Sequence, residues 1–270
     1  MYVSIEKNSP IGVFDSGVGG LTVVKEIVKR LPGERIIYFG DTANVPYGEK
    51  NAEELIRLAD NIAAFLVAQG VKAVVDACNS TSAVALEYLR ERYDVPFIGV
   101  IEAGVKGALN ATKNGKVGII ATRPTIESRA HKRLAKKLDP GVEVFGQVCS
   151  LFVPLVEAGR VSGPETALAA EIYLAPLLKK GIDTLILGCT HYPFLAPVIG
   201  KTMGSDVTLV DPAENTVKEL EKLLQGQIND NGPRTFADHE YFVSGDPVSF
   251  KDIGEKLIGA SLGRVNQQLL

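Results

Sequence analysis

Strand-like and helix-like patterns alternate along the whole of this 270-residue chain. Short apolar runs predict strands, and longer segments with apolar residues at three- and four-residue intervals predict helices. In the first half, strands are predicted at Ile11–Phe14, Arg35–Phe39, Ala73–Val75 and Phe97–Val100, and helices at Leu21–Leu31, Ala52–Gln69 and Ser82–Arg92. This order predicts a parallel sheet with helices on both faces, which is the arrangement of α/β proteins.

The same alternation starts again near residue 116. Strands are predicted at Lys116–Ala121, Val142–Val148, Thr184–Leu187 and Val207–Val210, and helices at Ile126–Leu138, Glu165–Lys179 and Pro193–Gly200. Three matching marks recur in chain order about 110 residues apart, namely Gly12-Val13 with Gly118-Ile119, Cys78 with Cys189, and Asp94-Val95 with Asp206-Val207. The nearly constant spacing indicates an internal duplication of one α/β unit.

The last part of the chain is too short to bury a core of its own. It predicts a helix at Ala213–Leu224, a polar turn-rich stretch at Gln225–His239, a strand at Tyr241–Ser244 and a final helix from Phe250. Within the polar stretch, Gln227–Asn231 and Gly232–Pro233 predict a solvated loop. We expect this tail to pack back on the first half. The expected domains are therefore a discontinuous one, residues 1–100 plus 211–270, and a second one, residues 101–210.

Composition and charge exclude several classes of protein. The formal net charge is −3 and both signs are mixed along the chain, so we expect no contact with nucleic acid or an anionic membrane. No uninterrupted apolar run is long enough to span a membrane, and Met1–Pro10 lacks the apolar stretch of a signal peptide. Three cysteines without a secretory signal predict free thiols and a cytoplasmic location.

Two of the cysteines occupy equivalent places in the duplicated pattern. Cys78 and Cys189 each follow an apolar run and precede hydrogen-bonding side chains. Ligands of open α/β sheets bind outside the carboxyl ends of the strands, where helix N-termini present unpaired N–H groups. Two thiols that face each other there would serve as acid and base on the two faces of one carbon atom. Cys149 is expected to be a buried structural residue.

Three further residues are candidates for tuning these thiols. Asp15 ends the first strand and opens a glycine-rich turn, His191 lies two residues after Cys189, and Glu157 lies in the segment Leu155–Gly159. A lone carboxylate is more often a solvated surface group, so Glu157 by itself is a weak candidate.

Competing motifs fail on their spacing. The turn Gly17-Val18-Gly19-Gly20 lacks the third glycine of a dinucleotide-binding fingerprint, because Thr22 occupies that place. The pair Cys189 and His191 has no second pair of ligands for zinc, and the sequence contains no CxxC. We therefore expect no metal site.

With these residues in view, the chain resembles the bacterial glutamate racemases over nearly its whole length. The resemblance is carried by Phe14-Asp15-Ser16-Gly17-Val18-Gly19-Gly20-Leu21, Asp41-Thr42 with Pro46-Tyr47-Gly48, Ala77-Cys78-Asn79, Leu155-Val156-Glu157-Ala158-Gly159 and Gly188-Cys189-Thr190-His191-Tyr192-Pro193. Several separate motifs in the right order are far more specific than any one of them. The resemblance implies two similar parallel-sheet α/β domains related by pseudo-twofold symmetry, with the active site at their interface.

The resemblance also implies residue roles. Cys78 would take the α-proton from D-glutamate and Cys189 would take it from L-glutamate. Asp15 would assist Cys78, and His191 and Glu157 would assist Cys189. The implied substrate contacts are Asp15, Ser16, Tyr47, Gly48, Asn79, Ser80, Thr190 and His191.

The activity implied by the resemblance is the interconversion of L- and D-glutamate without a cofactor, which supplies D-glutamate for peptidoglycan, the cell wall polymer that maintains cell shape. A homodimer is expected. Ser80 stands where the family usually has threonine, so a hydroxyl is kept and a methyl group is lost. The N-terminus is short, and we expect none of the extension on which some relatives bind an activator.

Three other functions are weighed against this one. A racemase for aspartate or another amino acid would use the same two thiols, and sequence gives no pocket size. A cysteine hydrolase would need a single nucleophile, form a thioester and leave the second thiol without a role. A non-catalytic amino-acid-binding module would bind glutamate without exchanging its α-hydrogen with solvent.

Overall fold

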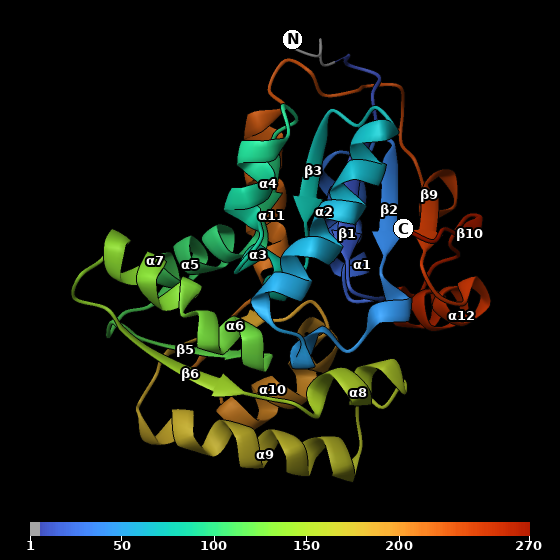
Figure 1. Cartoon of the computed structure of the whole chain (residues 1–270). Coiled ribbons are helices and arrows are strands. Elements are labelled where there is room, and N and C mark those ends of the chain that lie inside the picture. The colour runs from blue at the N-terminus through green and yellow to red at the C-terminus, as the bar shows by residue number, and fades with distance from the viewer. Residues whose placement is uncertain (1–5) are drawn as a thin grey trace.

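The computed structural model describes residues 6–270, and these residues form two parallel sheets (Figure 1). One sheet has the order β10-β9-β2-β1-β3-β4, and the other has the order β6-β5-β7-β8. The strands of the first are β1 (Ile11–Asp15), β2 (Ile36–Gly40), β3 (Ala73–Asp76), β4 (Phe97–Gly99), β9 (Glu240–Val243) and β10 (Val265–Gln267). Those of the second are β5 (Lys116–Ala121), β6 (Glu143–Val148), β7 (Thr184–Gly188) and β8 (Thr208–Val210). The predicted fold class is confirmed, because every pairing within these sheets is parallel.

Helices cover both faces of the six-stranded sheet. On one face lie α1 (Leu21–Arg30), α11 (Pro212–Leu223) and α12 (Pro247–Ile258), and on the other lie α2 (Ala52–Ala68) and α4 (Leu86–Arg92). Side chains that alternate along a strand supply the two cores. In β2, for example, Ile36 and Tyr38 join one core whereas Ile37 and Phe39 join the other.

The four-stranded sheet is covered in the same way. Its helices are α8 (Phe152–Glu157), α9 (Pro164–Lys179) and α10 (Ala196–Met203) on one face, and α5 (Val100–Ala111), α6 (Arg123–Ser128) and α7 (Ala130–Leu138) on the other. A single helical turn, α3 (Asn79–Ser82), follows β3. Figure 1 shows the two sheets in separate halves of the molecule, with β1, β2 and β3 above β5 and β6.

Capping explains why the predicted helix after Asn51 begins and ends where it does. The Asn51 side chain accepts a hydrogen bond from the Glu54 main chain, and the Glu54 side chain accepts one from the Asn51 main chain. Gly70, with a φ of 72°, ends the segment in the left-handed region that favours glycine. The predicted helix Ala52–Gln69 is confirmed to within one residue at its C-terminus.

Helices α5 and α8 were absent from the sequence prediction. α5 begins directly after β4, so the apolar residues of the strand run into those of the helix with no polar turn between them. The predicted single helix Ile126–Leu138 is also wrong, because Arg129 adopts a left-handed conformation with a φ of 56° and separates α6 from α7. Periodicity alone does not reveal such a break.

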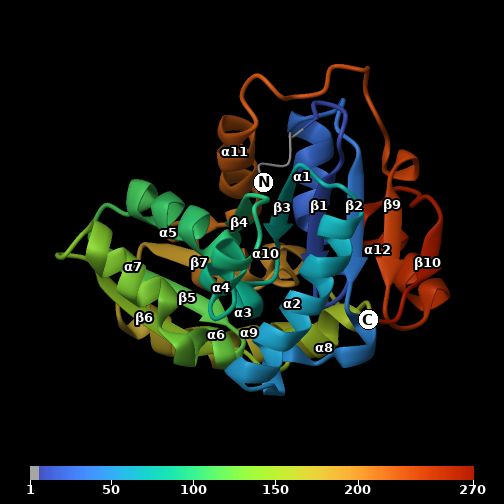
Figure 2. The ribbon, with the colours of Figure 1, turned by 45° about the horizontal axis from the view of Figure 1, so that its top comes forward.

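The tail returns to the first half of the molecule, as predicted. Strand β9 pairs with β2, and α11 packs against α1 and α5. Figures 1 and 2 show α11 beside the six-stranded sheet. Strand β10, which the sequence did not predict, pairs with β9 and extends the sheet. We propose that the boundaries predicted at residues 100 and 210 separate the two domains.

A buried ion pair anchors the polar segment that connects α11 to β9. Lys72 and Glu34 are both fully buried, and their side chains lie 2.7 Å apart. Lys72 also donates to the Gln227 carbonyl, and Glu34 accepts from the Asn229 N–H. The prediction of a solvated loop is therefore wrong around Asn229, which is 4% exposed. A fully buried ion pair needs further hydrogen bonds to offset the cost of removing its charges from water, and Gln227 and Asn229 provide them.

Two other sequence expectations meet the structure only in part. Residues 1–5, which belong to the segment Met1–Pro10 judged unlike a signal peptide, lie outside the described residues. Within residues 6–270, no helix has both the length and the apolar character needed to cross a membrane.

Candidate active site

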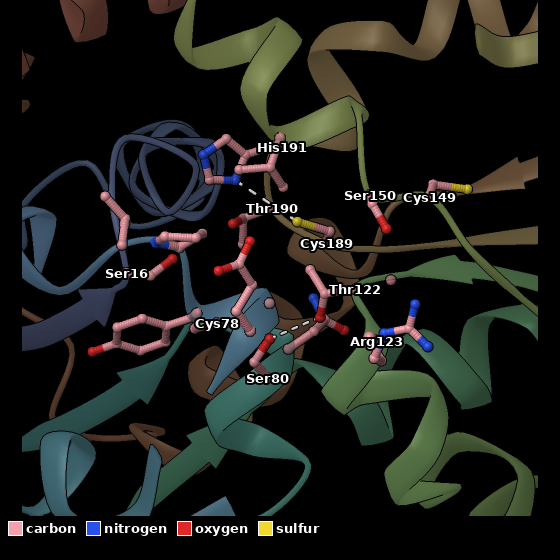
Figure 3. Close-up of a pocket in the computed structure, with 18 of the residues that line it drawn as sticks. Ser16, Cys78, Ser80, Thr122, Arg123, Cys149, Ser150, Cys189, Thr190 and His191 are labelled. Atoms are coloured by element: carbon pink, nitrogen blue, oxygen red, sulfur yellow. Dashed lines mark hydrogen bonds between the residues drawn. The ribbon is translucent and has the colours of Figure 1, made fainter. Parts of the chain in front are cut away.

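Strand ends from the two sheets meet at one cavity of about 280 Å³. Ser16 follows β1, Cys78 follows β3 and Cys189 follows β7, and all three line this cavity. β1 and β3 are neighbours in the six-stranded sheet, whereas β7 belongs to the other sheet. Figure 3 shows Cys78 and Cys189 among the side chains around this cavity. The duplicated thiols therefore share one cavity between the two sheets.

Most residues predicted for the site line this cavity. Besides the two cysteines, they are Ser16, Tyr47, Gly48, Asn79, Ser80, Thr190 and His191. Asp15 and Glu157 lie behind the wall instead. The Thr190 hydroxyl lies 3.3 Å from both carboxylate oxygens of Asp15 and donates to them, and Glu157 contacts His191.

Cys189, His191 and Glu157 form a chain of contacts. The Cys189 Sγ lies 3.7 Å from Nδ1 of His191, and Nε2 of His191 lies 2.6 Å from Oε1 of Glu157. Burial by itself would lower the pKa of His191, but its hydrogen bonds with Cys189 and Glu157 outweigh burial and raise the pKa well above the usual value. His191 is therefore a cation at neutral pH. A cation in this place stabilises negative charge on the Cys189 sulfur.

Cys78 has a different environment. Burial, reinforced by the neighbouring Asp15 carboxylate, raises the pKa of the Cys78 thiol. Its main-chain N–H donates to Oδ1 of Asp76 at 3.1 Å, and the Thr81 hydroxyl donates to the same oxygen at 2.6 Å. Cys78 is therefore a protonated thiol at neutral pH, held by a turn that Asp76 organises. Sequence reasoning did not single out Asp76, because it reads as part of an apolar strand.

Burial raises the pKa of Asp76 to about 8. Asp76 is fully buried, and its Oδ2 has no hydrogen-bond partner among residues 6–270. At neutral pH this carboxyl group is mostly protonated, because the folded protein cannot solvate its charge. With Asp76 neutral, the Asp15 carboxylate is the main negative charge that raises the pKa of the Cys78 thiol.

The turn after β1 is shaped by its carboxylate. Oδ2 of Asp15 accepts hydrogen bonds from the main-chain N–H groups of Gly17 and Gly20, at 3.3 and 2.9 Å. Tyr38 donates its hydroxyl hydrogen to the Gly17 carbonyl at 2.6 Å. Burial raises the pKa of Asp15, although the His191 cation and these N–H groups oppose the increase.

Glycine in this turn permits a close approach between the two halves. A Cβ atom on Gly19 would collide with the Thr190 hydroxyl and the His191 ring, and one on Gly17 would lie 3.0 Å from Oε1 of Glu157. The glycines therefore serve packing against the second sheet, which explains why the turn resembles a dinucleotide-binding loop without matching its spacing.

Tyr47 is fixed by a buried carboxylate. Its hydroxyl donates to Oδ2 of Asp41 at 2.6 Å, and the Ser244 hydroxyl donates to Oδ1 of Asp41 at 2.6 Å. Asp41 belongs to one of the motifs that carry the sequence resemblance, yet it does not line the cavity. Asp41 therefore belongs to the motif because it positions Tyr47, which lines the cavity.

The sequence analysis missed residues from the second half of the chain that line the cavity. They are Thr122, Arg123, Ser150, Val153 and Pro154. Thr122 follows the carboxyl end of β5 and Ser150 follows that of β6, so the rule that ligands bind at strand ends could have identified both. The Ser80 and Thr122 hydroxyls are 3.0 Å apart and join the two halves of the cavity wall.

Cys149 also borders the cavity, although it was expected to be purely structural. It is 1% exposed and belongs to the core of the second sheet. Its sulfur lies 3.8 Å from the Gln147 carbonyl and points away from Cys189 in Figure 3. Burial raises the pKa of this thiol.

The helix predicted at Pro193–Gly200 begins later than expected, because a 3₁₀ turn, Tyr192–Leu195, separates Cys189 from α10. The helix-end field expected at this thiol is therefore small, and the His191 cation provides the positive charge instead. Within residues 6–270, no three histidine, cysteine or acidic side chains are grouped so as to hold a metal ion.

Comparisons with known proteins agree with this geometry. Residues 11–220 match the family described as Asp/Glu/Hydantoin racemase. A glutamate racemase from Geobacter metallireducens is 48% identical over 257 residues, which cover 95% of each chain.

Solved structures give the same result. The fold matches the crystal structure of a glutamate racemase isoform from Bacillus anthracis with a TM-score of 0.89 and 38% identity over 98% of each chain. It matches a glutamate racemase from Francisella tularensis in complex with D-glutamate with a TM-score of 0.88 and 39% identity, again over 98% of each chain.

Replacing Asp76 by asparagine should change how stability depends on pH. In the wild type, the folded-state pKa of about 8 exceeds the unfolded-state value, so stability falls as pH rises through that window. Asparagine keeps an acceptor for Thr81 and Cys78 but does not titrate. From pH 5 to pH 8 the variant should therefore gain stability relative to wild type, by roughly 3 to 4 kcal/mol.

Urea unfolding followed by circular dichroism at the two pH values measures this difference. The exposed Asp94 provides a matched control, because the free energy of unfolding of Asp94→Asn should change with pH in the same way as that of wild type. A parallel profile for Asp76→Asn as well would show that the Asp76 carboxyl is already charged in the folded protein.

Proposed function

The chain belongs to the Asp/Glu/Hydantoin racemase family, and we propose that it interconverts L- and D-glutamate by a two-base mechanism that needs no cofactor. The observation that carries this proposal is the single cavity lined by both Cys78 and Cys189. A racemase must remove a proton from one face of a carbon atom and deliver one to the other face. Two thiols that reach one cavity from different sheets meet this requirement.

The charges around the two thiols suit opposite roles. His191 is a cation beside Cys189 and supports a thiolate there, whereas Cys78 is held protonated. This arrangement is ready for L-glutamate, because Cys189 is proposed to take its α-proton and Cys78 to deliver one to the opposite face. The reverse reaction starts from the opposite protonation of the two thiols.

The remaining polar groups support the proposed transition state. Removal of the α-proton builds negative charge on the substrate carboxylate, and donors fixed before the reaction stabilise such charge most effectively. Asn79, Ser80 and Thr190 line the cavity and can donate hydrogen bonds. Asp15, behind Thr190, is proposed to balance the substrate ammonium and so to assist Cys78. Ser16, Tyr47 and Gly48 are proposed to complete the contacts.

The proposal includes the setting of the enzyme. D-glutamate made by the reaction would enter peptidoglycan synthesis. Thiols that must stay reduced favour the cytoplasm. Closure of the two halves around the substrate would exclude water, since the cavity wall is shared between them. We also propose a homodimer.

The alternatives have less support. A hydrolase with one nucleophile leaves the second thiol on the cavity wall without a role. A binding module would need neither of the two thiols. An aspartate racemase is the nearest alternative, but the relatives with high identity are described as glutamate racemases.

Solvent exchange tests the proposed function. Purified protein incubated with L-glutamate in D₂O, with no added cofactor, should produce D-glutamate that carries deuterium at the α-carbon. Chiral chromatography with mass spectrometry measures both products, and L-aspartate in a parallel reaction should turn over far more slowly. Well-folded protein that yields no α-deuterated glutamate would falsify the proposal.

Single replacements of the cysteines test the two-base mechanism. Cys78→Ser and Cys189→Ser should each lower kcat by about 10²- to 10⁴-fold, because a serine hydroxyl is a much weaker acid than a thiol. Cys149→Ser should keep most of the activity, since its sulfur points away from the reacting centre. Equal losses in all three variants, with lower melting temperatures, would indicate damage to the fold instead.

Glu157→Gln should slow the proton transfer at Cys189 selectively. Glutamine keeps an acceptor for His191 but removes the charge that helps to hold His191 as a cation. The Cys189 step then limits the rate, so α-deuterated L-glutamate should show a larger kinetic isotope effect than α-deuterated D-glutamate.

Steady-state rates in water with the two labelled enantiomers provide the measurement. Glu165→Gln is the matched control, because Glu165 pairs with Arg160 on the surface and does not touch the site. Isotope effects that rise equally for both enantiomers in Glu157→Gln would rule out an action through Cys189.

A further inference from the structure

A second cavity, of about 190 Å³, lies on the reverse side of the active-site wall. It is bordered by the junction between α6 and α7 and by strands β5 and β6. Ile119 and Val144 supply apolar surface from the two strands. A water molecule occupies about 30 Å³ of liquid, so the cavity has room for a small molecule of several heavy atoms.

The charged side chains on this cavity are all cationic. Arg129 and Lys132 line it, and no acidic residue of the described chain does. Both side chains belong to exposed residues and reach the cavity from the α6–α7 junction. Arg129 is the only non-glycine residue within 6–270 with a positive φ, and this conformation ends α6 and starts α7 beside the cavity. The electrostatic character of the cavity therefore favours an anion.

A buried histidine provides a second and independent observation. His131 lines the cavity and is only 2% exposed, yet its Nε2 has no hydrogen-bond partner among residues 6–270. Buried polar atoms without partners are rare in folded proteins and call for an explanation. Burial also lowers the pKa of His131 to about 4, so the ring is neutral at physiological pH. A neutral ring that carries its hydrogen on Nε2 would donate to an oxyanion.

We propose that this cavity is a binding site for a small oxyanion, a phosphate or a carboxylate group, held by Arg129, Lys132 and His131. Arg129 and Lys132 supply charge-assisted hydrogen bonds, and the His131 ring supplies a neutral donor at the buried end. Ile119 and Val144 accommodate the apolar part of a larger ligand. This site is separate from the glutamate cavity, and none of its three polar residues takes part in the proposed racemisation.

Thr125 connects the two cavities. It lines the second cavity, and its hydroxyl lies 3.1 Å from that of Thr122 and 3.4 Å from that of Ser80, both of which line the first. Only Thr125 would therefore separate a bound oxyanion from Thr122 and Ser80, which line the proposed glutamate cavity. The site is placed to adjust that wall when it is occupied.

Proton NMR of the histidine rings tests the proposal without reference to activity. The chain has three histidines, so the ring signals are few and can be assigned by single-histidine replacements. Titration with inorganic phosphate, and separately with acetate, at constant ionic strength should shift the His131 signal saturably, and the tighter of the two identifies the preferred oxyanion. No saturable shift of His131 with either anion, or a shift confined to His191, would overturn the proposal.

Charge variants complete the test. Arg129→Gln together with Lys132→Gln should weaken binding by about tenfold or more, because each cation supplies a charge-assisted contact. Lys137→Gln, which removes an exposed charge of α7 that does not line the cavity, should leave binding unchanged. An equal loss in both proteins would mean nonspecific attraction and contradict a built site. Circular dichroism confirms that each variant is folded.

Discussion

The site depends on the close approach of the turn after β1 to the residues that follow β7. Gly19 lies so near Thr190 and His191 that no side chain fits there, and Asp15 accepts a hydrogen bond from Thr190 across the same contact. This contact joins two sheets that otherwise have separate cores. This contact helps to bring Cys78, which follows β3, and Cys189, which follows β7, to one cavity.

The two thiols are equivalent in the duplicated sequence but not in their surroundings. Cys189 lies beside a histidine that a carboxylate keeps charged, whereas Cys78 lies beside buried carboxyl groups and keeps its proton. Fixed charges of this kind need no rearrangement when charge develops on a substrate, which is how preorganised sites lower barriers. Asp76 and Asp41 show that residues off the cavity wall matter as well, since one organises the Cys78 turn and the other fixes Tyr47.

The oxyanion site behind Thr125 extends this picture to the second half of the chain. Its polar residues come from a helix junction that periodicity presented as one continuous helix, and the left-handed Arg129 separates the two helices beside the cavity. Thr125 lies in α6, the helix that ends at this junction. The second half therefore contributes more than a second thiol to the proposed enzyme.

The sequence by itself determined the alternation of strands and helices, the duplication, and the two cysteines at equivalent strand ends, because these depend on local periodicity and on residue type. It also identified most of the cavity wall through its motifs. Tertiary structure alone decided the break at Arg129 and the burial of Asn229 beside the Lys72–Glu34 pair. It also placed Asp15 and Glu157 behind the wall. These features depend on contacts between residues far apart in the chain, and no local pattern records which distant groups will meet.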